Sequence, residues 1–79
     1  MINQQIIVSD TWQLVSNNID YTLQVTSGSI YIKAASETPS TIVGSFELSN
    51  GQVISNQVLH GKVYIRTADN LLAYVSLAV

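Results

Sequence analysis

The sequence holds few side chains that can do chemistry, and they form no catalytic set. His60 is the single histidine and cysteine is absent. A histidine base needs a nucleophile and an orienting carboxylate, and the sequence places neither close to His60. We therefore interpret His60 as an exposed loop residue beside Gly61. A chain with one histidine and no thiolate also cannot build an ordinary zinc site by itself.

The acidic residues give no recognisable pattern. They are scattered singly, whereas glycoside hydrolysis uses a pair of carboxylates and a calcium loop uses an Asp-x-Asp repeat. Folding can still bring distant carboxylates together, so this point stays open at the level of sequence. The glycines stand singly at turns rather than in a phosphate-binding loop. We predict a protein that is not an enzyme and has no cofactor. The acidic residues are Asp10, Asp20, Glu37, Glu47 and Asp69.

The sharpest candidate for a binding site is a set of tyrosines that we predict to be exposed, accompanied by basic residues. In Lys62-Val63-Tyr64-Ile65-Arg66-Thr67, apolar and polar side chains alternate strictly, so they point to opposite sides of an extended strand. Tyrosine and arginine anchor protein interfaces because they bury area and keep a polar end. The same side chains can stack on a sugar ring, or tyrosine can simply reflect its preference for strands. If these strands share a sheet, we predict a partner-binding patch made of Tyr31, Lys33, Lys62, Tyr64, Arg66 and Tyr74.

Alternating segments separated by turn residues run through the chain, and no helical period of usable length is present. This pattern predicts an all-β fold, a small antiparallel β-sandwich or barrel of about seven or eight short strands. Ser27-Gly28 and Asn50-Gly51 are predicted to close hairpins, the second of type I′. Gly44 is a candidate bulge, and Trp12 is expected in the core. The predicted strands cover residues 4–8, 11–15, 19–26, 29–35, 42–48, 52–54, 61–67 and 71–79.

Length and composition favour one domain, residues 1–79, that works in contact with other subunits. The chain is 47% hydrophobic and only 10% charged, which leaves few ions to solvate the surface of a small domain. We expect a homo-oligomer, with a trimer preferred. The alternative is a compact monomer covered by Ser, Thr, Asn and Gln. Three basic residues cannot form a phosphate-binding stripe, so we expect no nucleic acid and no membrane as a partner.

Several short segments of the second half follow one another in a set order. They are Ser29-Ile30-Tyr31-Ile32-Lys33, Glu37-Thr38-Pro39, Phe46-Glu47-Leu48, Asn50-Gly51, Gly61-Lys62-Val63-Tyr64-Ile65-Arg66 and Ala73-Tyr74-Val75-Ser76-Leu77. This order resembles that of small bacteriophage virion proteins, both capsid cement or decoration proteins and tail or fibre accessory proteins. The resemblance spans residues 29–77 and offers no catalytic residues.

The resemblance implies a structural role in a virus particle. It favours a capsid cement subunit that binds between copies of the major capsid protein, with another virion protein as partner in the tail or fibre case. A carbohydrate-binding module is a further alternative. The first residues lack the basic and apolar regions of a signal peptide, so we expect a product made in the host cytoplasm. The resemblance implies that the protein is located in the virion.

Overall fold

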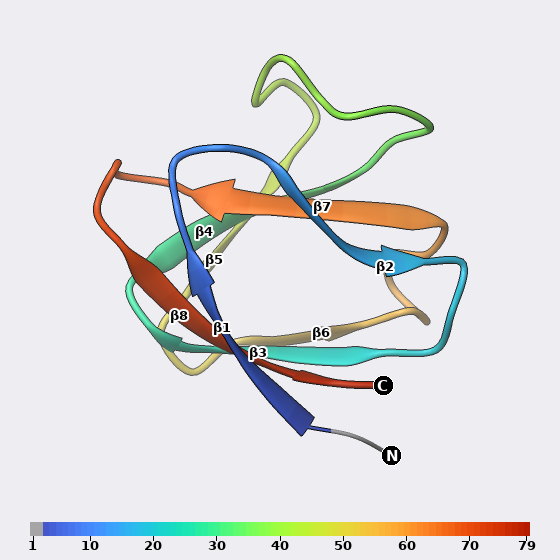
Figure 1. The fold of residues 1–79 in the computed structure, drawn as a ribbon, viewed down its shortest axis with the longest axis horizontal. Helices are drawn as coiled ribbons and strands as arrows, with labels where there is room; N and C mark the ends of the chain where they lie inside the picture. Colours follow the sequence, from blue (N-terminus) through green and yellow to red (C-terminus); the bar gives the residue numbers. More distant parts are fainter. Residues whose placement is uncertain (1–2) are drawn as a thin grey trace.

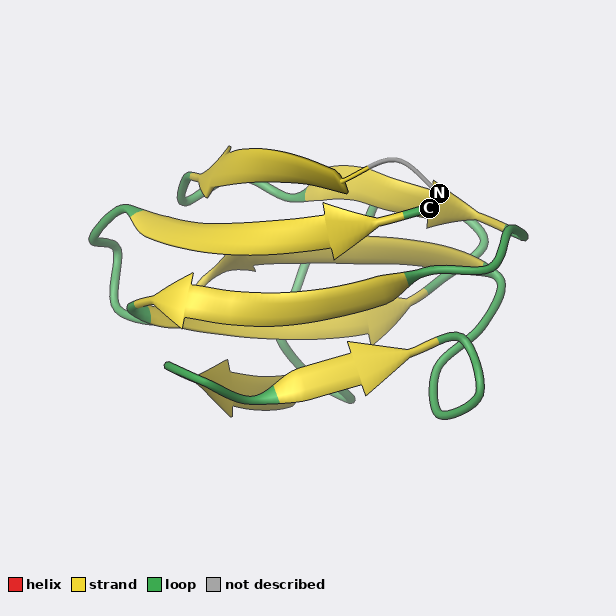
Figure 2. Ribbon diagram, turned by 90° about the horizontal axis from the view of Figure 1, so that it is seen from below, coloured by secondary structure: helices red, strands yellow, loops and turns green. Residues whose placement is uncertain are grey.

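The computed structural model describes residues 3–79, which form eight β-strands in two antiparallel sheets of four strands (Figure 1). The prediction of a small all-β sandwich is confirmed. The sheets pack face to face, as Figure 2 shows with one sheet in front of the other. The strands are β1 (Asn3–Val8), β2 (Gln13–Asn17), β3 (Thr22–Ser27), β4 (Ser29–Ala34), β5 (Phe46–Ser49), β6 (Val53–Ser55), β7 (Lys62–Thr67) and β8 (Ala73–Ala78).

The strand pairs are nested along the chain. β1 pairs with β8, β2 with β7, β3 with β6 and β4 with β5, so the chain forms one long antiparallel ribbon whose tip is the loop between β4 and β5. The ribbon wraps on itself, because β3 also pairs with β8 and β4 also pairs with β7. The resulting sheet orders are β1-β8-β3-β6 and β2-β7-β4-β5, which is the topology of a jelly roll.

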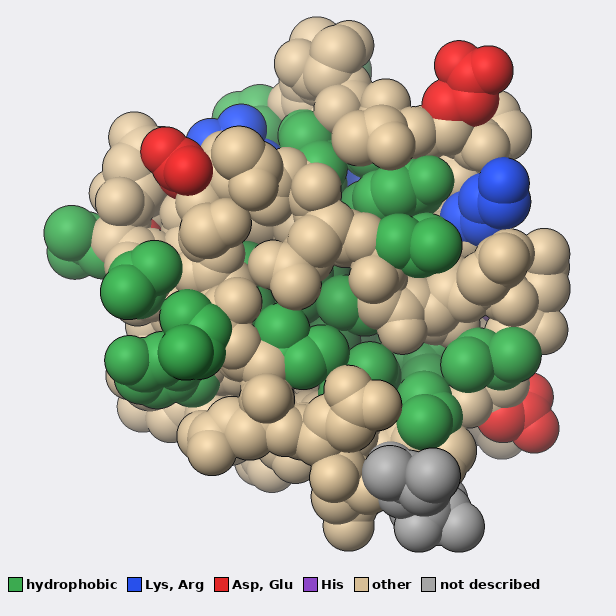
Figure 3. All heavy atoms as spheres, in the orientation of Figure 1, with side chains coloured by type: hydrophobic (Ala, Val, Ile, Leu, Met, Phe, Trp, Pro, Cys, Tyr) green, Lys and Arg blue, Asp and Glu red, His purple; other side chains and the backbone are tan. Residues whose placement is uncertain are grey.

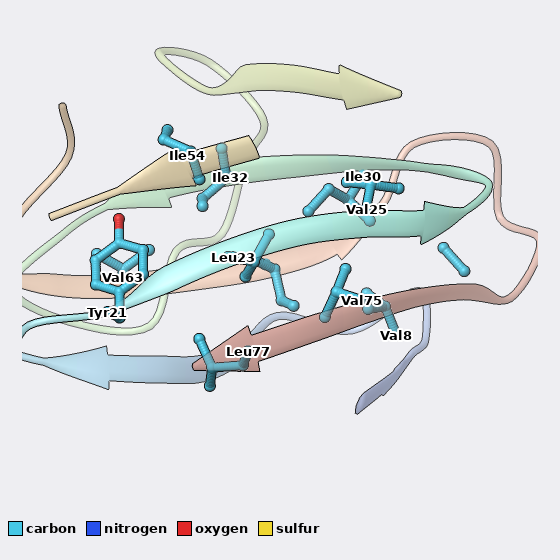
Figure 4. Close-up of a cluster of buried hydrophobic side chains, with 12 residues drawn as sticks. Val8, Tyr21, Leu23, Val25, Ile30, Ile32, Ile54, Val63, Val75 and Leu77 are labelled. Atoms are coloured by element: carbon cyan, nitrogen blue, oxygen red, sulfur yellow. The ribbon is translucent and has the colours of Figure 1, made fainter. Parts of the chain in front are cut away.

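The core lies between the sheets and is built from alternate residues of the strands (Figure 4). Strand β7 follows the predicted alternation on its inner side, since Val63, Ile65 and Thr67 are almost fully buried. Alternation also holds in β8 and in the first four residues of β3, where every second side chain is apolar and points inward. The buried cluster consists of Val8, Tyr21, Leu23, Val25, Ile30, Ile32, Ile54, Val63, Ile65, Ala73, Val75 and Leu77.

Tyr21 ties the end of the core to the long loop that follows β6. Its hydroxyl donates a hydrogen bond to the carbonyl of Leu59 at 2.5 Å, and its backbone N–H donates to Asn56 Oδ1 at 3.2 Å. Burial raises the pKa of the Tyr21 hydroxyl above its ordinary value of 10.0, because the charged phenolate loses hydration inside the protein. The fold therefore favours the protonated, hydrogen-bond-donating form of this side chain.

Gly28 does not close a hairpin, so that prediction is wrong. β3 and β4 belong to different sheets, and Gly28 is the corner at which the chain passes from one to the other. Its φ of 84° lies in the region that glycine adopts readily. A Cβ placed there would stand 3.0 Å from the Cβ of Ala73, a buried residue of β8. The corner thus depends on a residue with no side chain.

Asn50-Gly51 is a turn, as predicted, but the type I′ hairpin is wrong. The N–H of Gln52 donates to the carbonyl of Ser49 at 3.0 Å, which closes the turn. Gly51 has a φ of 91° while Asn50 lacks the positive φ that type I′ requires. β5 and β6 belong to different sheets, so this turn is a second corner at which the chain passes from one sheet to the other.

Three predicted strands extend too far. Val43 is 76% exposed, and Ser45 N–H donates to the carbonyl of Ile42 in a turn that includes Gly44, so Gly44 is not a bulge. Ile19 and Leu71 are exposed loop residues that precede β3 and β8. The predicted strand over residues 11–15 is shifted as well, because β2 begins at Gln13 and continues to Asn17. An apolar loop residue next to a strand can extend the alternating pattern although it lies outside the strand. The sequence pattern therefore placed the ends of these strands incorrectly.

Candidate functional site

The outer face of the β2-β7-β4-β5 sheet gathers most of the predicted patch. Because the neighbouring residues of β4 and β7 point into the core, the outward positions of these strands fall on one surface. Tyr31 of β4 lies opposite Arg66 of β7, and Lys33 lies opposite Tyr64. Lys62 begins β7 in the same phase and is exposed. The chain contains three basic residues, and all of them lie on this face.

Tyr74 does not belong to the patch. It lies on β8 in the other sheet, opposite Ile7 of β1, and points outward from the far side of the sandwich. Its side chain is 38% exposed, so the outward phase was predicted correctly. The prediction is wrong about the sheet to which Tyr74 belongs. Alternation indicates on which side of its own strand a residue lies, but it does not indicate which strands are neighbours.

Tyr64 is on the expected face but is only 7% exposed. β7 is an inner strand of its sheet, and the register puts Lys33 on one side of Tyr64 and Leu14 on the other. The prediction of an exposed tyrosine is therefore wrong at this position. Tyr64 forms the floor of the patch, while Tyr31 and Arg66 are half-buried around it.

Trp12 lies on this outer face rather than in the core, which corrects the sequence-based interpretation. The Arg66 guanidinium carbon is 5.9 Å from the centre of the Trp12 ring, within the range of a cation–π interaction. Gln13 pairs with Ile65, so the chain brings Trp12 alongside Arg66. The indole Nε1 is buried and has no hydrogen-bond acceptor among residues 3–79. The sequence carried no signal for this placement, since Trp12 and Leu14 form the more apolar phase of their strand and yet lie on its outer side.

The lysine ammonium groups of this face hydrogen-bond to neutral backbone carbonyl groups. Lys33 Nζ donates to the carbonyl of Thr41 at 3.5 Å, and Lys62 Nζ donates to the carbonyl of Ser36 at 3.5 Å. Such contacts leave the cationic charge uncompensated. One carboxylate joins the face, since Glu47 of β5 lies opposite Tyr31. We call this surface the basic face and define it as Trp12, Tyr31, Lys33, Lys62, Tyr64 and Arg66.

A shallow cleft lies at one end of the basic face. It has a volume of about 450 Å³, and His60, Lys62 and Asn18 are among the residues that line it. The lining includes no carboxylate, so His60 has no partner there to orient it as a base. Within residues 3–79, no group of three or more His, Cys, Asp or Glu side chains is placed to hold a metal ion.

Comparison with known proteins finds no matching family model, no matching curated protein and no matching solved structure. Within the part of the chain that the structure describes, no helix is long and apolar enough to span a membrane. The interpretation of the site therefore depends on its own geometry and charge.

Proposed function

We propose that this protein is a non-enzymatic structural subunit that adheres to a larger assembly through the basic face. The observation that supports this role is the concentration of all three basic side chains and of Trp12, Tyr31 and Tyr64 on one sheet. Aromatic and arginine side chains carry most of the binding energy in protein interfaces. The face thus combines residues that bury area with charges that select a partner.

The chemistry of the basic face indicates an acidic protein surface as the partner. Among residues 3–79 the three cations hydrogen-bond only to neutral oxygens, so carboxylates of a partner can form charge-assisted hydrogen bonds with them. Arg66 is held on Trp12, which reduces the conformational entropy that it loses on binding. Electrostatic attraction of this kind is weakened by salt, so binding is expected to fall as ionic strength rises.

We propose specifically that the assembly is a phage head and that the chain is a cement or decoration subunit bound between major capsid subunits. The small jelly roll supports this proposal by analogy, because the fold occurs in viral capsid domains. A position on the tail or a fibre uses the same face and differs in the partner. Many bound copies would stabilise the particle, because a ligand that binds only the assembled state shifts the equilibrium toward that state.

The test uses purified phage particles with and without this protein. Wild-type protein is expected to bind the particles and to increase the fraction that survives heating. Charge reversal by Lys33→Glu with Arg66→Glu is expected to abolish both effects. Gln24→Glu is a control for negative charge added elsewhere, because Gln24 is exposed on the outer face of the opposite sheet. Equal survival with and without the protein, or absence of the protein from particles by mass spectrometry, refutes the role in the head.

The second candidate function is carbohydrate binding, for which the half-buried Tyr31 is the remaining aromatic platform. The geometry weakens this candidate, since Tyr64 is buried and Tyr74 lies on the other sheet. A glycan array distinguishes the two functions. Binding that disappears in Tyr31→Ala while the fold is retained supports the carbohydrate-binding module, and an array without binding rejects it.

A further inference from the structure

The four edge strands of the two sheets differ in how they are protected against pairing with another chain. Natural edge strands are kept from pairing by shortness, charged residues, proline or bulges. β6 has three residues, and β5 has four residues that include Glu47. β2 is interrupted by a register shift between Leu14 and Ser16. Each of these three edges therefore carries at least one protective feature.

β1 carries none of these features. It has six residues, Asn3-Gln4-Gln5-Ile6-Ile7-Val8, with no charge, no proline and no glycine. Its register with β8 is continuous from Asn3 opposite Ala78 to Val8 opposite Ala73. In Figure 2, β1 forms the outer border of its sheet, and no strand of the described residues lies beyond it. Backbone N–H and C=O groups along this border are thus available to a further strand.

The outward side chains of β1 and of the adjacent β8 carry no charge. The outward side chains of β1 are amides and Ile7, and those of the adjacent β8 include Tyr74 and Ser76. Figure 3 shows no Lys, Arg, Asp or Glu side chain over β1. A hollow of about 360 Å³ lined by Gln5, Ile7 and Tyr74 lies next to the edge. These outward side chains carry no charge with which to bind a charged partner. Two copies of the surface can therefore meet without like-charge repulsion.

We propose that β1 is a dimerisation strand that pairs antiparallel with β1 of a second copy of this chain. The two-fold arrangement joins the two β1-β8-β3-β6 sheets into one continuous sheet across the dimer. With Gln5 on the two-fold axis, the two Gln5 amides lie opposite each other. An amide both donates and accepts, so the pair is complementary to itself. Asn3 of each copy then stands opposite Ile7 of the other, beside the hollow.

This dimer is independent of the proposed function, because it uses the edge of one sheet and leaves the outer face of the other free. An edge pairing buries less than the ~800 Å² per partner of a standard interface, so the association is expected to depend on concentration. Sedimentation of the full-length protein without an N-terminal tag measures it. Wild-type protein is expected to shift from 8.6 kDa toward twice that mass as its concentration rises.

Charge substitutions at the two-fold axis give the decisive test. Gln5→Lys places two positive charges opposite each other and is expected to give a monomer, and Gln5→Glu is expected to do the same. An equimolar mixture of these two variants is expected to form dimers again, because opposite charges then face each other. Gln24→Lys, exposed on the same outer face but two strands away from the edge, is the matched control and should dimerise as wild type does.

Several results would overturn the proposal. A wild-type protein that stays at 8.6 kDa at every concentration, or that forms a trimer, excludes the two-fold edge pairing. A Gln5→Lys variant that still dimerises places the interface elsewhere, as does a Gln24→Lys variant that becomes monomeric. Failure of the mixed variants to associate contradicts the antiparallel register. Circular dichroism of each variant establishes that the fold is retained.

Discussion

The corner at Gly28 leads to a quantitative prediction about stability. In Gly28→Ala, the new methyl group lies 3.0 Å from the Cβ and 3.3 Å from the Cα of Ala73. Ala73 is fully buried on β8, which is held between β1 and β3, so it has little room to move away. The φ of 84° adds a conformational cost for any residue with a Cβ.

Comparison with Gly51 separates the cost of the positive φ from the cost of the close contact with Ala73. It has a similar φ of 91°, yet an added Cβ would meet no atom within 4 Å. The positive φ costs about 1–2 kcal/mol, and reduced entropy of the unfolded chain returns about 0.4–1 kcal/mol. We therefore expect Gly51→Ala to lower the free energy of unfolding by about 1 kcal/mol. Gly28→Ala carries an additional overpacking cost of about 1–3 kcal/mol, for a total loss of about 2–4 kcal/mol.

Urea denaturation followed by the fluorescence of Trp12, the single tryptophan, measures both variants. Adding Ala73→Gly to Gly28→Ala removes the methyl group that the new side chain meets. The double variant is then expected to lose less stability than the sum of the two single changes. Equal losses for Gly28→Ala and Gly51→Ala, together with simple additivity in the double variant, would refute the packed corner.

Further predictions concern the core and the folding rate. Thr67→Val removes a buried hydroxyl that has no hydrogen-bond partner among residues 3–79, and it is expected to raise the free energy of unfolding by about 1 kcal/mol. Ile65→Ala, at a fully buried site, is expected to lower it by about 2–5 kcal/mol, whereas Val43→Ala changes it by less than about 0.5 kcal/mol. The pKa of Tyr21 is raised in the folded state, so stability is retained below pH 10 and lost as pH rises through the folded pKa, and Tyr21→Phe is expected to reduce this alkaline loss. Since β1 pairs with β8 and β2 with β7, folding is expected to take milliseconds to seconds in stopped-flow measurements.

Each of these expectations has a result that contradicts it. Destabilisation by Thr67→Val would mean that the hydroxyl is satisfied in solution. A similar loss for Ile65→Ala and Val43→Ala would mean that the sandwich core is not where the structure puts it. Unchanged alkaline stability in Tyr21→Phe would remove the link between burial of this hydroxyl and pH. Folding within microseconds would be inconsistent with the nested strand pairs.

The sequence by itself determined which side of many strands is buried. In residues 62–67 and 73–78, strict alternation predicts the inward side chains correctly, because the two faces of a strand are fixed by local backbone geometry. The same local rule predicts that Tyr31, Lys33 and Arg66 point outward. Glycine content likewise marks Gly28 and Gly51 as places where the chain changes direction, since both adopt the positive φ that glycine tolerates, although neither closes the predicted hairpin.

Only the tertiary structure decided which strands are neighbours. Gly28 is a corner rather than a hairpin because β3 pairs with β8, and β4 with β7, strands from the other end of the chain. The same long-range pairing puts Tyr74 on the far side of the sandwich from Tyr31, although the two residues follow the same local pattern. Alternation within a strand contains no information about its partner. The contact between Trp12 and Arg66, and with it the basic face, exists only once distant strands have paired.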